Sequence, residues 1–309
     1  MASKGEITVN SLRRLLHCKA EEWPDSLADR LEAVNTLYRR ATKVDVEEYV
    51  LEILERMNAP FFQRDREENL QAWETGWSEN LEALKGHLSE ENLRPRYFRP
   101  SKFFRYNKNV ILPENPHLEY DLFSIVRYYL FNRHFCGFAA IYELGCGSCQ
   151  NIYTLAKLFP ETKIVGLDWA KASIEIIDLI AKEFDGSIHG FLFDMTAPPK
   201  NMRIEKNSLV FSIHALEQLG PNTEKLISFL LEQKPALVFH YEPILELYDK
   251  TNLYDYLAAM YSRTRNYLSG YLTALRNLAR AGKIELIGEH RPYIGGVYHE
   301  ASLVFWRPI

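Results

Sequence analysis

The sequence predicts an α/β protein with a mostly parallel sheet of seven strands, preceded by a helical N-terminal region. Two observations lead to this fold class. In most of the chain before residue 135, apolar residues recur at helical spacings of three and four positions. After residue 138, short apolar runs alternate with helical stretches. That alternation is typical of βαβ units whose sheet is buried on both faces.

Residues 1–93 are expected to form three or four helices. Three apolar stripes follow helical spacing, and each defines one face of an amphipathic helix. Asp45 stands where it can cap the second of these helices. We expect the region to act as a lid, a substrate wall or a dimerisation element. The stripes are Leu27, Leu31, Val34 and Tyr38; Val46, Tyr49, Val50, Ile53, Leu54 and Met57; and Leu70, Trp73, Trp77, Leu81 and Leu84.

Residues 94–134 are predicted to be a basic and aromatic linker that leads into a helix over Leu118–Phe131. Residues 94–108 contain six basic and no acidic side chains, interleaved with aromatic rings, whereas residues 21–93 contain 8 basic and 18 acidic ones. Such a composition can bind nucleic acid, but six charges are few for a dedicated binding domain. We expect the linker instead to cross the mouth of the site, neutralising an anionic substrate or packing on the acidic helices.

Residues 135–309 are predicted to hold all seven strands of the sheet. Only residues 290–301 separate the last two strands, which is too short for a helical crossover, so this pair is expected to be antiparallel. The predicted strands are Ala139–Leu144, Lys163–Leu167, Ile188–Phe193, Leu209–Ile213, Ala236–Phe239, Ile284–Ile287 and Ser302–Trp306. The predicted helices are Asn151–Leu158, Ala172–Phe184, Thr223–Gln233 and Leu253–Ala281.

The composition excludes several classes of protein. The chain has 309 residues, 37 basic and 41 acidic side chains, a formal net charge of −4 and 47% apolar residues, as in an ordinary soluble protein. No window approaches the roughly 18 consecutive apolar residues of a membrane span, and the first ten residues lack the apolar segment of a secretory signal. Four cysteines do not make a disulfide framework in a chain of this length. We therefore expect a cytoplasmic protein without a membrane partner.

The loop after the first core strand carries the main motif. Gly145 and Gly147 permit a tight turn and a close backbone approach before a helix N-terminus. Glu143, just ahead of the turn, would repel a pyrophosphate but suits a cationic ligand with an amino group. Asp168 ends the second strand at the spacing of an acid that accepts hydrogen bonds from ribose hydroxyls. Asp194 ends the third strand, where it can accept from an adenine amino group. Because ligands bind beyond the carboxyl ends of such strands, these acids are expected to share one crevice.

These motifs, Glu-x-Gly-x-Gly, Gly-Leu-Asp and Phe-Asp-Met, resemble those of the class I S-adenosylmethionine-dependent methyltransferases. The resemblance covers about residues 135–309 and implies a Rossmann-like sheet with strand order 3-2-1-4-5-7-6 and S-adenosylmethionine as cofactor. It implies that Glu143 and the glycines surround the amino-acid part, Asp168 holds the ribose, and Asp194 with Met195 flanks the adenine. One departure is Gln150, which replaces the usual third glycine. The expected cofactor-binding residues are Glu143, Gly145, Cys146, Gly147, Asp168, Trp169, Asp194, Met195 and Ser212.

Candidates for the reacting end follow the fourth and fifth strands. Methyl transfer from a sulfonium needs positioning, and a base where the acceptor is a hydroxyl or a protonated amine. His214 is the first candidate base, with a structural role at the end of its strand as the alternative. Glu242 either grips the substrate or caps a helix, and His299 in the terminal hairpin is a second candidate base. Glu217 is expected to begin the next helix rather than to face the pocket.

Two other signals are set aside. Cys146 and Cys149 have the spacing of a metal or redox motif, but they lie inside the cofactor loop without further cysteines nearby, so no metal site is expected. The Asn/Asp-Pro-Pro-aromatic signature that amino-methyltransferases of nucleic acid carry after the fourth strand is absent. Methylation of nucleic acid is therefore not expected.

The sequence thus predicts a methyltransferase acting on an oxygen or nitrogen atom of a polar small molecule, with a homodimer as one possible assembly. Two alternatives stay open. One is a protein or peptide methyltransferase whose acidic helices recruit a basic partner, and the other is a non-catalytic cofactor-binding protein. The stretch from Glu242 through Arg265 to Trp306 also resembles bacterial sugar O-methyltransferase-type proteins.

Overall fold

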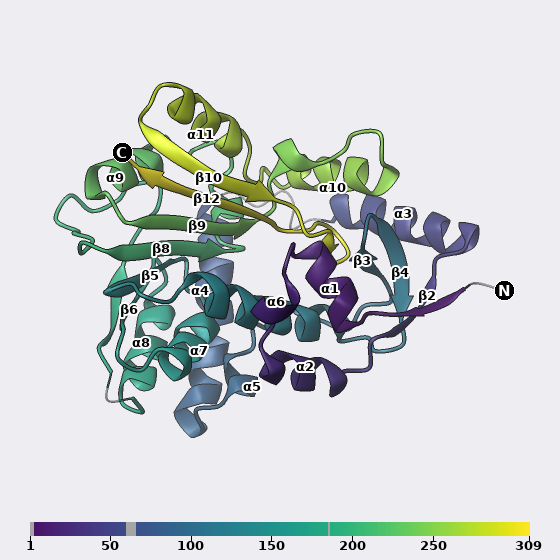
Figure 1. Cartoon of the computed structure of the whole chain (residues 1–309), viewed down its shortest axis with the longest axis horizontal. Helices are drawn as coiled ribbons and strands as arrows, with labels where there is room; N and C mark the ends of the chain where they lie inside the picture. The colour runs from purple at the N-terminus through teal and green to yellow at the C-terminus, as the bar shows by residue number, and fades with distance from the viewer. Residues whose placement is uncertain (1–2, 60–65, 185) are drawn as a thin grey trace.

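A seven-stranded sheet forms the centre of the computed structural model, which describes residues 3–59, 66–184 and 186–309 (Figure 1). Its order is β10-β12-β9-β8-β5-β6-β7, with β5 to β9 parallel and β12 and β10 antiparallel. Along the chain this is the predicted order 3-2-1-4-5-7-6, so the fold prediction is confirmed. The strands are β5 (Ala140–Leu144), β6 (Lys163–Asp168), β7 (Ile188–Leu192), β8 (Ser208–Ile213), β9 (Leu237–Glu242), β10 (Ile284–His290) and β12 (Ser302–Pro308).

Alternating side chains explain why helices cover both faces of this sheet. Ile141 and Phe211 belong to one apolar cluster, whereas their chain neighbours Tyr142 and Val210 belong to another on the opposite face. The first cluster includes residues of α6 (Leu118–His134), α7 (Gln150–Leu158) and α8 (Lys171–Ala181). The second includes residues of α9 (Glu224–Gln233) and α11 (Tyr271–Arg280).

The predicted helix over Leu253–Ala281 is in fact two helices, α10 (Leu253–Thr264) and α11. Between them Asn266 and Gly270 have φ values of +52° and +76°. Left-handed residues cannot continue a right-handed helix, so they end α10 and redirect the chain. Among the described residues, no helix combines the length and the apolarity that crossing a bilayer needs.

The N-terminal region is mostly helical, and two of the three predicted stripes are correct. They lie on α3 (Lys43–Met57) and α4 (Arg66–Gly86). The N-cap of α3 is Thr42 rather than Asp45, whose carboxylate instead accepts the Thr42 N–H at 2.8 Å in a capping box. The first stripe, Leu27 to Tyr38, is helical only as far as Glu32, because Tyr38 lies in a strand. The remaining helices here are α1 (Val9–Leu15), α2 (Asp25–Glu32) and α5 (Glu90–Leu93).

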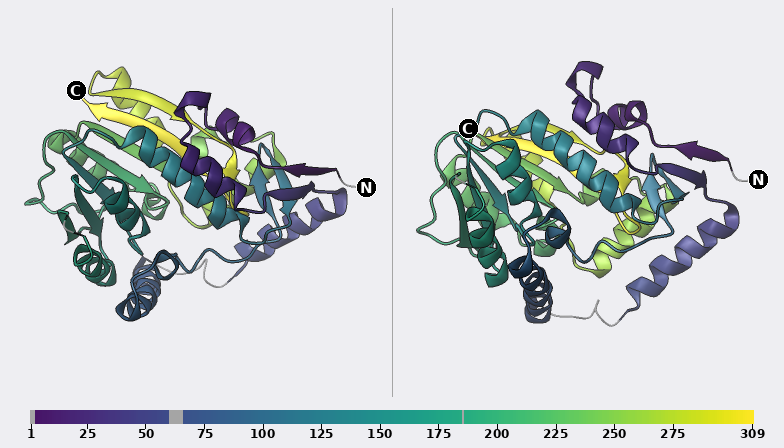
Figure 2. Two further views of the ribbon diagram at one scale, coloured as in Figure 1. Left: turned by 60° about the horizontal axis from the view of Figure 1, so that its bottom comes forward. Right: turned by 90° about the horizontal axis from the view of Figure 1, so that it is seen from below.

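A second, five-stranded sheet lies beside the first and was not predicted (Figures 1 and 2). It has the order β1-β2-β4-β3-β11 and draws strands from all three predicted segments of the chain. Its strands have only two to five residues, too few to show a periodic pattern. They are β1 (Lys4–Glu6), β2 (Leu37–Arg40), β3 (Phe104–Tyr106), β4 (Asn109–Pro113) and β11 (Ile294–Gly295).

A buried ionic cluster joins this second sheet to the rest of the protein. Arg105 of β3 pairs with Asp255 of α10 at 2.7 Å and with Glu300 at 3.0 Å. Arg291 pairs with the same two carboxylates, both at 2.6 Å. No side chain of the four is more than 5% exposed. Buried charges of this kind persist only when each is paired, so the cluster holds the second sheet to α10 and the terminal hairpin.

The basic linker packs on the acidic helices, which is one of the two roles expected for it. Lys102 pairs with Glu48 of α3 at 2.5 Å, and Arg96 pairs with Glu79 of α4 at 3.4 Å. With Arg105 buried in the ionic cluster, half of the six basic side chains are paired to acids of this chain. Part of the charge contrast seen along the sequence is therefore satisfied internally.

Candidate active site

A cavity of about 420 Å³ lies at the carboxyl ends of the central parallel strands. This is the end of an open parallel sheet at which ligands bind. The cavity is lined by eight of the nine residues predicted to hold the cofactor. They are Glu143, Gly145, Cys146, Gly147, Asp168, Trp169, Asp194 and Met195.

The loop after β5 requires its two glycines. Gly145 and Gly147 have φ values of +69° and +52°, in the left-handed region. A Cβ atom on Gly145 would lie 2.5 Å from the Cβ of Ala215, and one on Gly147 would lie 2.8 Å from the ring of Trp77. Gln150, in place of the third glycine, is the first residue of α7, and its amide donates to the hydroxyl of Tyr120.

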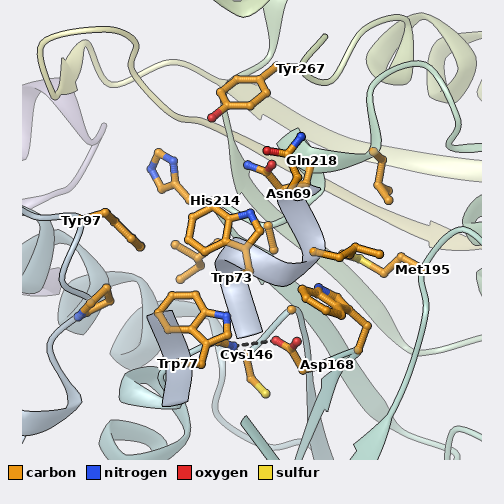
Figure 3. Close-up of a pocket in the computed structure, with 18 of the residues that line it drawn as sticks. Asn69, Trp73, Trp77, Tyr97, Cys146, Asp168, Met195, His214, Gln218 and Tyr267 are labelled. Atoms are coloured by element: carbon orange, nitrogen blue, oxygen red, sulfur yellow. Dashed lines mark hydrogen bonds between the residues drawn. The ribbon is translucent and has the colours of Figure 1, made fainter. Parts of the chain in front are cut away.

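Asp168 joins the end of β6 to this loop (Figure 3). Its Oδ2 accepts the N–H of Gly147 at 2.7 Å, and its Oδ1 accepts the N–H of Ala170 at 2.9 Å. Burial raises the pKa of Asp168 to about 6, although these hydrogen bonds favour the ionised form. Each carboxylate oxygen has a second acceptor site. The side chain can therefore also receive hydrogen bonds from ligand hydroxyls.

Glu143 has a buried carboxylate oxygen that is unsatisfied. The residue is 1% exposed, and its Oε1 accepts from the amide of Asn151, which Arg127 in turn holds at 3.0 Å. Its Oε2 has no hydrogen-bond partner among the residues that the structure describes. Burial raises the pKa of Glu143 well above its usual range. An ammonium group in the cavity would supply the missing donor, so the residues present fit a cofactor with an amino-acid part.

Asp194 is tied to the N-terminal region by a residue that the sequence analysis missed. Arg66, the first residue of α4, donates to Oδ2 of Asp194 at 2.8 Å. The N–H and hydroxyl of Thr196 donate to Oδ1 at 2.8 and 2.6 Å. Burial opposes ionisation, but the hydrogen bonds from Thr196 and Arg66 outweigh it and lower the pKa. Nothing in the local sequence around Arg66 marks it as part of a site.

Helix α4 forms one wall of the cavity. Trp73 and Trp77 stack with ring centroids 5.3 Å apart, and both line the cavity (Figure 3). Glu74 of the same helix accepts the backbone N–H groups of Lys171 and Ala172 at 2.9 and 3.1 Å. These are the first residues of α8, whose N-terminus favours a negative charge. This contact fixes the helix that carries the two tryptophans.

A second cavity, of about 490 Å³, adjoins the first. Its lining is rich in tyrosine, and the rings of Tyr261 and Tyr298 stack with centroids 4.7 Å apart. Glu52 and Arg56 of α3 also contribute, so the N-terminal region helps to form this cavity. Residues common to both cavities are Trp73, Tyr97, Phe123, His214, Arg265 and Tyr267.

His214, Glu217 and His299 meet where the two cavities adjoin. Oε2 of Glu217 lies 3.7 Å from Nδ1 of His214 and 3.4 Å from Nε2 of His299. Burial disfavours both imidazolium ions. For His214 the carboxylate of Glu217 outweighs burial and raises the pKa, whereas the pKa of His299 falls to about 4. Glu217 does begin a short helix, Leu216–Leu219, but it also faces the second cavity, contrary to expectation.

Ser212 and Glu242, both predicted site residues, line neither cavity. Glu242 is fully buried, and its Oε1 accepts from the Ser212 hydroxyl at 2.7 Å and from the N–H groups of Ala215 and Leu216 at 2.9 and 3.1 Å. These bonds hold the loop that carries His214. The Ser212 hydroxyl is thus bonded to Glu242 and is not directed into a cavity, and the bonds from Ala215 and Leu216 agree with the helix-capping alternative for Glu242.

No family model matches the sequence, and no curated protein matches it. Solved structures with a similar fold include the [4+2]-cyclase SpnF, 13% identical, with a TM-score of 0.43 over 59% of this chain and 79% of that chain. The plantazolicin methyltransferase BpumL, in complex with SAH, is 12% identical, with a TM-score of 0.42 over 78% of this chain and 98% of that chain. The N-methyltransferase NodS from Bradyrhizobium japonicum WM9, also in complex with SAH, is 12% identical, with a TM-score of 0.45 over 74% of this chain and 98% of that chain.

The strand order itself defines the fold. Five parallel strands followed by an antiparallel hairpin, in the order 3-2-1-4-5-7-6, are the arrangement that the resemblance to the class I methyltransferases implied. The site of this chain combines the tryptophan pair of α4 with the group of two histidines and one glutamate.

Proposed function

We propose that this chain is an S-adenosylmethionine-dependent methyltransferase acting on an oxygen or nitrogen atom of a polar small molecule in the cytoplasm. One observation carries the proposal. Glu143, Asp168 and Asp194, at the ends of three consecutive strands, line one cavity that opens beside a second. A fold alone does not define an activity, so the proposal depends on these acids and their surroundings.

The first cavity has a partner for each polar part of the cofactor. Oε2 of Glu143 accepts from the ammonium group, and Asp168 accepts from the ribose hydroxyls. Asp194 and Met195 flank the adenine, while Arg66 keeps the Asp194 carboxylate in place. When bound, the cofactor supplies a methyl group on a positively charged sulfur atom.

The second cavity holds the methyl acceptor. Tyrosine rings and hydroxyls in its lining suit a polar molecule with an apolar face. Trp73 and Tyr97 border both cavities and exclude water from the point where the acceptor meets the methyl group. His214 lies at the same boundary, within reach of an acceptor proton.

The internal pairing of the acidic helices favours a small molecule over a peptide. A peptide methyltransferase would present its acids to a partner, yet Glu48 and Glu79 pair with basic residues of this chain. The four cysteines, all free, agree with a reducing compartment.

Calorimetry with S-adenosylmethionine tests the proposal. We expect the wild-type chain to bind and Asp168→Asn to bind about 10- to 150-fold more weakly, because a hydrogen bond to a charged group contributes about 1.5–3 kcal/mol. Asp178→Asn, an exposed acid on α8, is the matched control and should bind like the wild type. Circular dichroism of each variant checks the fold.

Absence of binding to the wild-type chain overturns the proposal, and an unchanged affinity of the folded Asp168→Asn variant removes the role given to Asp168. The acceptor is then sought by measuring S-adenosylhomocysteine release with sugars, phenols, amines and a basic peptide. Turnover with the peptide alone would favour the peptide alternative.

A further inference from the structure

Glu217 lies at distances from His214 and His299 that are close to those between neighbouring ligands of one metal ion. Nδ1 of His214, Oε2 of Glu217 and one ring nitrogen of His299 lie within 4.8 Å of one another. The two contacts of Glu217 are 3.4 and 3.7 Å long. In a tetrahedral site with ligands about 2.1 Å from the ion, neighbouring ligand atoms lie about 3.4 Å apart.

Hydrogen bonding does not account for the same geometry. A charge-assisted N–H···O bond is about 2.7–2.9 Å long, shorter than either contact of Glu217. Oε2 of Glu217 and Nδ1 of His299 both lack a hydrogen-bond partner among the described residues. The Glu217 side chain is only 10% exposed. A nearly buried carboxylate oxygen that faces two imidazoles without a hydrogen bond is satisfied by a cation between them.

The surrounding structure fixes the backbone of His214 and the side chain of Glu217. The N–H of His214 donates to the carbonyl of Tyr241 at 3.1 Å, and its φ of +52° turns the chain at this point. The amide of Gln218 donates to Oε1 of Glu217 at 3.1 Å, which leaves Oε2 directed at the histidines. A hydrogen bond to a ligating carboxylate, such as that from Gln218, orients the ligand and strengthens metal binding.

We propose that His214, Glu217 and His299 bind a divalent first-row transition metal ion, with zinc best suited to the ligand set. Two imidazoles and one carboxylate occupy three positions of a tetrahedral ion and leave the fourth open. Both His214 and His299 line the second cavity, so the open position faces the space assigned to the acceptor.

The catalytic consequence rests on the proposed function. A hydroxyl at the open position releases its proton to solvent more readily than a free hydroxyl. Its oxygen then forms the C–O bond to the methyl carbon while the C–S bond breaks and its electron pair stays on sulfur. His214 is in this case a ligand, and no side-chain base is required.

The test is metal binding by the purified full-length chain after dialysis against a chelator. We expect one Zn²⁺ per chain by calorimetry, and one Co²⁺ per chain with the visible absorption of a tetrahedral ion. Glu217→Gln and His299→Asn should each weaken binding by more than about tenfold. His189→Asn, an exposed histidine of β7, is the matched control and should bind like the wild type.

Failure of the wild-type chain to bind either ion overturns the inference, as does undiminished binding by both Glu217→Gln and His299→Asn. If these variants do not fold, a zinc-soaked crystal of the wild type decides, by the presence or absence of anomalous density at the three side chains. S-adenosylmethionine binding to the metal-free chain is measured in parallel. A chain that binds the cofactor but neither metal ion refutes only this inference, and a chain that binds a metal ion but not the cofactor refutes only the proposed function.

Discussion

Replacing Glu119 by glutamine should stabilise the protein, and more strongly at higher pH. Glu119 lies near the start of α6 and lines the second cavity. Burial raises its pKa from an ordinary value of 4.5 to about 7, opposed only by the charge of His214. The folded state therefore favours the protonated carboxyl, and folding stability falls as the pH rises from about 4.5 to about 7. The shift from 4.5 to about 7 corresponds to about 3 kcal/mol of folding free energy.

Glutamine has the same shape as glutamate and no charge to bury, so the variant does not lose folding stability as the pH rises. At pH 8 we expect the free energy of unfolding of Glu119→Gln to be higher than that of the wild type by up to about 3 kcal/mol. At pH 5.5 this difference should be smaller by about 2 kcal/mol. Urea unfolding at both pH values, in chelator, measures this. Glu161→Gln, at an exposed position, is the control. A difference between Glu119→Gln and wild type that is the same at both pH values would refute the reasoning.

Three further substitutions test other features. Gly147→Ala places a Cβ 2.8 Å from the Trp77 ring at a φ of +52°. Calorimetry should therefore show that the affinity for S-adenosylmethionine falls at least about tenfold, a cost of about 1.4 kcal/mol. A normal affinity would mean that the loop adapts. Gly76→Ala lies within α4 with no atom within 4 Å of the new Cβ and should raise the unfolding free energy by about 0.5–1 kcal/mol. Arg105→Met leaves two buried carboxylates with one arginine, and urea unfolding should show a loss of about 3–5 kcal/mol; a loss below about 1 kcal/mol would mean that the cluster is not holding the second sheet.

The larger sheet was predictable because its strands are long enough to show a pattern. Each has five to seven residues, and parallel strands direct their carboxyl ends to one edge. That geometry alone brings Glu143, Asp168 and Asp194 to the same cavity. The short strands of the second sheet carry no comparable signal, since two to five residues fit several structures equally well.

Position at a strand end did not reveal which way a side chain points. His214 and Glu242 follow neighbouring strands, yet only His214 reaches the cavities, while Glu242 turns inward to hold backbone N–H groups. The contributions of Arg66 and the tryptophans depend on where α4 packs, which is a tertiary contact. The stripe of α4 predicted an apolar face but not the cavity that this face would close.

The last strand of the smaller sheet has a consequence for the order in which the chain acquires its structure during synthesis. Ile294 and Gly295 pair with Tyr106 and Arg105, nearly 190 positions earlier in the chain. While the ribosome translates the middle of the protein, the sheet of β1 to β4 lacks β11, which pairs with β3 at its edge. Arg105 also lacks Glu300 at that stage. Pairings so distant in sequence form slowly because a long loop must close first. Although they are synthesised before β11, β1 to β4 are therefore expected to be among the last parts to become protected from proteolysis.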